Sequence, residues 1–160
     1  MWEPGLIFDW ACSLLEIFAL ALLTVRRGEI STRVSLGLWI FSSLLMQLVT
    51  AQIYLWCKNY PDQTYAIWYG SWIIFNAFSL WILLILHQML KASTSNFTRL
   101  VSASFFVLTL IQIAGYLDRA IFGTKILDEF YRFMIIGINF AILPAVAAEL
   151  WKHRQQEGVV

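Results

Sequence analysis

The chain has 160 residues, of which 60% are hydrophobic, 16% aromatic and only 13% charged, with a formal net charge of +1. An ordinary soluble domain carries about 25% charged residues, so this composition excludes a soluble globular domain, a disordered chain and a disulfide-stapled secreted module. A net charge of +1 does not favour binding to the negatively charged backbone of nucleic acid, so we expect no nucleic-acid partner. The composition therefore predicts an all-α integral membrane protein whose first partner is the lipid bilayer.

Five apolar segments are long enough to cross a bilayer, because a hydrocarbon core about 30 Å thick takes roughly 20 apolar residues in a helix. They lie at about Ile7–Val25, Val34–Trp56, Tyr65–Leu90, Leu100–Leu117 and Phe130–Trp151. The first lacks the positive n-region and the cleavage site of a signal peptide, so we expect it to remain as a helix. Short polar connections separate the five. The sequence thus predicts one polytopic domain, a compact bundle of five transmembrane helices with no separate soluble domain.

Lysine and arginine residues orient the predicted bundle. One side carries Arg26, Arg27, Arg33, Lys91, Arg99, Lys152 and Arg154, and the other carries only Lys58, Arg119, Lys125 and Arg132. The richer side is expected in the cytoplasm, and all six tyrosines fall at the opposite side, where aromatic rings favour the headgroup level. We therefore expect a multi-pass protein of a plasma (inner) membrane with its N-terminus outside and its C-terminus in the cytoplasm.

Each predicted span carries one strong hydrogen-bonding side chain near its centre. These five residues are Glu16, Gln47, Asn76, Gln112 and Asn139. A polar group in hydrocarbon costs several kcal/mol unless it has a partner, so the five are expected to face inward, toward one another or toward water. For the four amides, hydrogen bonds that hold the helices together are the leading interpretation. The lining of a polar path is the alternative.

Helix packing explains Glu16 less easily than the four amides, because an ionised carboxylate at the bilayer centre costs at least about 2.5–3.5 kcal/mol. At 100° per residue, Asp9, Ser13 and Glu16 share one face of the first helix and form a polar seam. Two interpretations stay open for Glu16. It is either a protonatable or ion-coordinating group on a conduction path, or a neutral carboxyl group bonded to an amide of a neighbouring helix.

Three further features have both a structural and a functional interpretation. Asp9 is expected to form an ion pair with Arg119 or Arg132 at the outer side, or else a charged rim at a pore mouth. His87 lies near the cytoplasmic end of the third span, where we expect a capping or headgroup-level residue rather than a proton relay to Glu16. The connection 118–129 alternates apolar and charged residues, which fits either an interfacial amphipathic turn or a simple loop.

Small residues recur at four-residue spacing on the fifth span and predict a helix-packing face. They are Gly137, Ala141 and Ala145, with Pro144 close to the same stripe. Small side chains let another helix approach closely, and a proline inside a helix is expected to bend it.

No enzyme or cofactor motif is present in the sequence, neither GxGxxG nor a P-loop, HExxH or GxSxG. We therefore expect no catalytic residue, no metal and no cofactor. Two functions remain. The first is a non-catalytic membrane subunit that acts through helix–helix contacts in a homo-oligomer or a larger membrane complex. The second is a small oligomeric channel or an ion- or proton-coupled carrier that uses the polar seam around Glu16.

Overall fold

A computed structural model describes residues 14–22, 24, 29–124 and 126–157 of the chain. These residues form helices joined by short turns, and no strand occurs among them. Of the first predicted span, Ile7–Val25, the structure describes chiefly a helical segment at residues 14–22, which we call the N-terminal segment. Asp9 and Ser13 lie outside the described residues.

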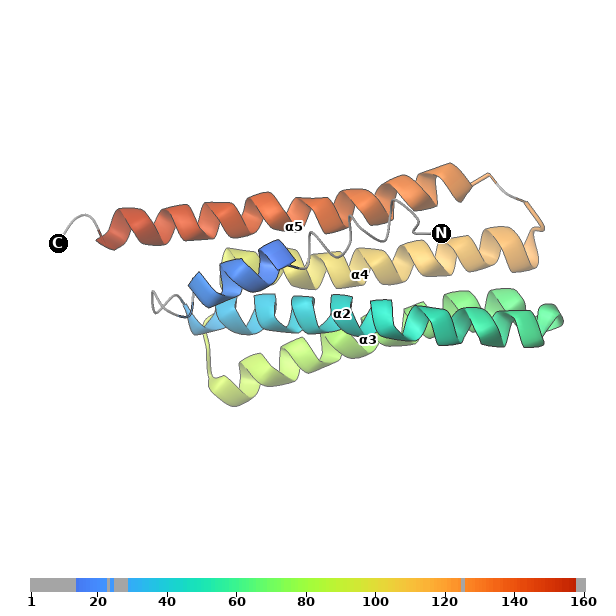
Figure 1. Ribbon diagram of the computed structural model, residues 1–160, viewed down its shortest axis with the longest axis horizontal. Coiled ribbons are helices and arrows are strands. Elements are labelled where there is room, and N and C mark those ends of the chain that lie inside the picture. Colours follow the sequence, from blue (N-terminus) through green and yellow to red (C-terminus); the bar gives the residue numbers. More distant parts are fainter. Residues whose placement is uncertain (1–13, 23, 25–28, 125, 158–160) are drawn as a thin grey trace.

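Four long helices follow one another in alternating directions (Figure 1). They are α2 (Ile30–Asn59), α3 (Thr64–Leu90), α4 (Asn96–Tyr116) and α5 (Asp128–Glu157). A short 3-10 helix, η1 (Pro61–Gln63), joins α2 to α3, and a π-helical turn, η2 (Leu117–Ile121), extends α4. All four long helices are sufficiently long and apolar to cross a membrane. The second to fifth predicted segments are thus confirmed as long apolar helices.

The core of the bundle is formed by α2, α3 and α4, which all pack against one another. Among the long helices, the described backbone of α5 comes close only to α4. Figure 1 shows the N-terminal segment running alongside α2 and below α5. Its Ala19 belongs to the same buried apolar cluster as Ile142 and Val146 of α5.

Each core helix buries one face, with buried residues recurring every three or four positions as helical periodicity requires. The buried face of α3 consists of Tyr69, Trp72, Asn76, Ser79, Leu83 and His87. Three fully buried aliphatic side chains, Leu36, Leu83 and Val101, come one from each core helix. We call these three the apolar layer.

Six polar side chains form a hydrogen-bonded group at the end of the bundle where α2 and α4 begin and α3 ends. We call it the hydroxyl–imidazole cluster; its members are Ser31, Thr32, Ser35, His87, Ser95 and Thr98. His87 Nδ1 lies 2.9 Å from the carbonyl oxygen of Leu83. Because a carbonyl only accepts, Nδ1 carries a proton, and Nε2 lies within hydrogen-bond distance of the Ser31 hydroxyl oxygen, 2.9 Å away.

Thr98 of α4 links this helix to α2. Its hydroxyl oxygen lies 2.7 Å from the hydroxyl oxygens of both Ser31 and Ser35 on α2. It also lies 3.0 Å from that of Ser95, which caps α4 by accepting from the Thr98 backbone N–H. His87, expected as a capping or headgroup-level residue, is thus buried among hydroxyl groups at the end of the bundle.

The connection between α4 and α5 is organised by a buried carboxylate. The Thr124 hydroxyl donates to Asp118 Oδ1, and the Leu127 backbone N–H donates to Asp118 Oδ2 at 3.3 Å. Gly123 occupies the left-handed region with φ +64°, where a side chain would be strained. The apolar residues Phe122 and Ile126 are 70% and 81% exposed, so they contribute no packing to this turn.

A Thr98→Val substitution tests the hydroxyl–imidazole cluster. Valine keeps the shape of threonine but removes the hydroxyl group that joins α2 to α4, so we expect the free energy of unfolding to fall by about 1–3 kcal/mol. The matched control is Thr109→Val on the same helix, because the Thr109 hydroxyl donates only within α4, to the carbonyl oxygen of Phe105 at 2.9 Å. Circular dichroism during unfolding in mixed detergent micelles measures both. Equal effects of the two substitutions would contradict the account.

Candidate functional site

A cavity of about 350 Å³ lies between the helices of the bundle. The N-terminal segment and all four long helices contribute lining residues. Each long helix presents one face to it, as the spacing of Trp68, Trp72 and Asn76 on α3 shows. Small-molecule sites occupy about 300–1,000 Å³ and often lie between the helices of bundles, so the cavity is large enough to hold a small solute.

The five polar residues that the sequence places near the centres of the spans all line this one cavity. They are Glu16, Gln47, Asn76, Gln112 and Asn139. They come from five different helical segments, and helix packing alone brings them together. The other members of the predicted polar seam, Asp9 and Ser13, lie outside the described residues.

Contacts between helices show which lining residues lie at each end of the cavity. At the end nearest the apolar layer, the rings of Trp39 and Phe105 lie 5.1 Å apart between centroids. Toward the other end, the Tyr131 hydroxyl donates to Gln112 Oε1 at 2.9 Å. We call the end of the cavity nearest the apolar layer its inner end and the opposite end its outer end. Glu16 lies at the inner end, through its contact with Trp39, and Tyr131 lies at the outer end.

Glu16 is buried, with 3% of its surface exposed. The indole Nε1–H of Trp39, also 3% exposed, donates to Glu16 Oε1 at 3.2 Å. Sequence reasoning missed this donor, since Trp39 and Glu16 are 23 positions apart and only the packing of the N-terminal segment against α2 brings them together. Among the described lining residues there is no lysine or arginine.

Gln112 is held in one orientation by the tyrosine that donates to it. Because the Tyr131 hydroxyl occupies Oε1, the amide N–H₂ group of Gln112 remains a donor for other partners. Tyr131 is in turn positioned by Tyr69, whose ring meets it edge to face at 5.7 Å. The Tyr69 ring lies against Gly115, where an added Cβ would come within 2.7 Å of the Tyr69 ring.

Asn76 is the most deeply buried of the described polar residues in the cavity wall, with 0% of its surface exposed. Neither Nδ2 nor Oδ1 of its side chain has a hydrogen-bond partner among the described residues. An unpaired buried amide costs about 1–3 kcal/mol. Residue 76 thus offers a donor and an acceptor to whatever occupies the cavity.

Aromatic rings form much of the remaining wall. Trp68 and Trp72 pack edge to face, 5.7 Å apart at 84°, and both line the cavity together with Tyr131. The sequence analysis places Tyr131, with the other tyrosines, at the outer headgroup level and does not predict that Trp68 and Tyr131 line a cavity. The spacing of Tyr131, Ile135 and Asn139 on one face of α5 is the signal that could have found it.

The remaining predicted residues lie away from the cavity. Arg119 is half-buried and Arg132 is exposed, while Asp9, their expected partner, is outside the described residues. His87 belongs to the hydroxyl–imidazole cluster, 11 positions or about 16 Å along α3 from Asn76. Of the described residues, no three His, Cys, Asp or Glu side chains come together as a metal site.

The predicted helix-packing stripe of α5 faces largely away from the bundle. Gly137, Ala141 and Pro144 are exposed, and a Cβ added at Gly137 would meet nothing within 4 Å. Ala145 is half-buried and packs against the core. Pro144 lies inside α5, which continues as a helix on both sides of it.

Comparison of the chain with protein-family models, curated proteins and solved structures finds no match.

The substitution Asn76→Leu tests whether the Asn76 amide holds the helices together or lines the cavity without bonding to another helix. No described residue bonds to the Asn76 amide, so leucine removes a buried polar group of similar size without breaking a contact between helices. We expect the free energy of unfolding to stay the same or to rise by up to about 1 kcal/mol. The control is Ser79→Ala, one turn along the same face, because Ser79 bonds to Ser42 across the helix interface at 3.0 Å. Ser79→Ala should lower the free energy of unfolding, because it removes this hydrogen bond between α2 and α3. A loss of stability in Asn76→Leu would show instead that the amide holds the helices together.

Proposed function

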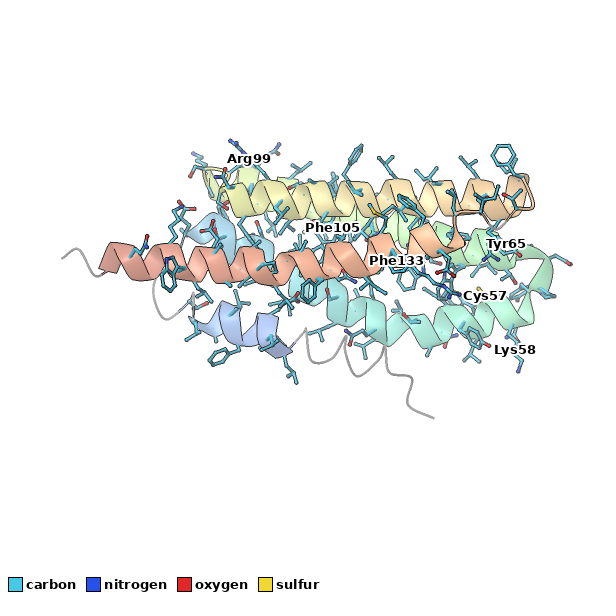
Figure 2. All side chains as sticks on the ribbon, turned by 90° about the horizontal axis from the view of Figure 1, so that it is seen from above. Cys57, Lys58, Tyr65, Arg99, Phe105 and Phe133 are labelled. Carbon is cyan, nitrogen blue, oxygen red and sulfur yellow. The ribbon has the colours of Figure 1, made fainter. Side chains whose placement is uncertain are left out.

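We propose that the chain is a multi-pass protein of a plasma (inner) membrane, with five transmembrane helices, its N-terminus outside and its C-terminus in the cytoplasm. Four long apolar helices support the membrane placement. Figure 2 shows Lys58 and Tyr65 at one end of the bundle and Arg99 at the other, with Phe105 between them. The excess of lysine and arginine at the Arg99 end supports the orientation.

Within this membrane, we propose that the protein binds a small polar solute in the cavity and does so without catalysis. The convergence of five midspan polar residues on one cavity carries this proposal. A membrane helix rarely holds such residues without a partner or a function. Here both amide atoms of Asn76 lack a hydrogen-bond partner among the described residues.

A closed inner end favours a binding protein or carrier over an open channel. The apolar layer of Leu36, Leu83 and Val101 lies between the cavity and the hydroxyl–imidazole cluster and is fully buried. A hydrophobic constriction of this kind stops water and ions. At the other end Thr50 and Trp68 are only half-buried, so entry from the outside is the route that the packing favours.

Cysteine labelling tests this cavity directly. In a background with Cys12 and Cys57 replaced by serine, Ser43→Cys places a thiol on the cavity wall, and Ala77→Cys places one on the exposed surface of α3 beside Asn76. A membrane-impermeant thiosulfonate added outside intact cells should label position 43 and leave position 77 unlabelled, because lipid covers it. Labelling of both, or of position 77 alone, would contradict the proposed cavity and its membrane setting. Labelling of position 43 only from the cytoplasmic side of inverted vesicles would contradict the orientation.

A membrane subunit that acts through helix–helix contacts is the second candidate, favoured by the open small-residue stripe of α5. In this role the protein would assemble as a homo-oligomer or within a larger membrane complex. We then expect Gly137→Leu to reduce the mass of the purified particle, measured by light scattering in detergent, because leucine prevents close helix approach. Glu16→Gln is the control and should leave the mass unchanged. A particle that is monomeric before any substitution would contradict this candidate.

A further inference from the structure

The inner end of the cavity has the chemistry of a cation site. The Glu16 carboxyl group lies there, 3% exposed, with the Trp39 indole N–H as a donor to one oxygen. Taking an ionised carboxylate out of water costs several kcal/mol unless an opposite charge accompanies it. No lysine or arginine of the described chain lines this cavity, so a cationic solute would supply the missing positive charge.

Aromatic rings surround the same space. Trp39 and Phe105 meet at 5.1 Å beside Glu16, and Trp68, Trp72 and Tyr131 close the outer part. A cation within about 6 Å of an aromatic ring face is stabilised by about 0.5–2 kcal/mol, and more for tryptophan than for other rings. An anionic solute would meet the repulsion of both the carboxylate and the ring faces.

The size and the polar groups of the cavity favour an organic cation over a metal ion. A volume of about 350 Å³ far exceeds that of a single dehydrated ion, and no three potential acidic, histidine or cysteine ligands come together among the described residues. Asn76 offers an unpaired donor and acceptor midway along the wall, and Gln112 offers an oriented donor. These amides suit a hydroxyl or carbonyl group on the body of the solute.

We propose that the solute is a small organic cation, whose ammonium group lies against the Glu16 carboxyl group and among the aromatic rings that line the cavity. Its polar body lies against Asn76 and Gln112. This inference rests on the proposed solute site and specifies the chemical class of the ligand.

Three probes of the same shape and different charge test the inference. They are choline, its neutral carbon isostere 3,3-dimethyl-1-butanol, and the anion 3,3-dimethylbutanoate. The full-length protein is placed in vesicles of phosphatidylethanolamine and phosphatidylglycerol, which contain no choline headgroup, and binding is followed by tryptophan fluorescence. We expect choline to bind at least about tenfold more tightly than the neutral isostere, and the anion to bind most weakly.

The variant Glu16→Gln should reduce the preference for choline over the neutral isostere to near one, while binding of the isostere itself continues and reports a folded cavity. The matched control is Asp62→Asn, the same change of carboxylate to amide at an exposed position in η1, which should keep the full preference. Equal binding of all three probes, or preference for the anion, would overturn the cation assignment and leave the solute site standing. Absence of binding by all three would overturn the solute site as well.

Discussion

A buried polar side chain must find a partner, and this requirement governs the arrangement of the whole bundle. The helices are too apolar to be positioned by charged faces. Their polar side chains instead determine which faces turn inward. The bundle meets the requirement in two ways. At one end, hydroxyl groups and one imidazole form hydrogen bonds with one another and so hold α2, α3 and α4 together. In the middle, the polar groups gather around a cavity, where Asn76 has no hydrogen-bond partner in the part of the chain that the structure describes.

The two polar regions have different consequences because the apolar layer separates them. The polar groups of the hydroxyl–imidazole cluster bond to one another and to nearby backbone atoms, so the cluster stabilises the helix packing and offers little to a ligand. The cavity, by contrast, holds a carboxylate, an unpaired amide and several aromatic rings. Because Leu36, Leu83 and Val101 close the inner end, a solute that enters from outside would stop at Glu16. A transport cycle would then require the three core helices to move apart at this layer.

The sequence predicts the long helices well, because hydrophobic runs, polar breaks and helical periodicity are local properties. It also identifies the five polar residues that meet at the cavity, since a strong hydrogen-bonding group in an apolar helix has few alternatives to facing inward. It does not reveal the hydroxyl–imidazole cluster. Single serine and threonine residues are ordinary in apolar helices, and their partners lie as many as 67 positions away, so the contacts depend on the register of α2 against α4. The Trp39–Glu16 contact and the unpaired state of Asn76 are hidden for the same reason, because each depends on how neighbouring helices rotate.

The central claim is that the polar centre of this bundle is a hydrated, ligand-accessible cavity rather than a set of hydrogen bonds that closes the helices together. Solid-state NMR of the protein in lipid bilayers, with magnetisation transferred from mobile water to side-chain amide nitrogens, measures this directly. Asn76 is assigned by the signal that disappears in Asn76→Leu. Rapid transfer from water to the Asn76 side chain, with none to the backbone amide of Ala77 on the exposed surface of α3, is the predicted result. No transfer to Asn76 in a folded protein would contradict the account.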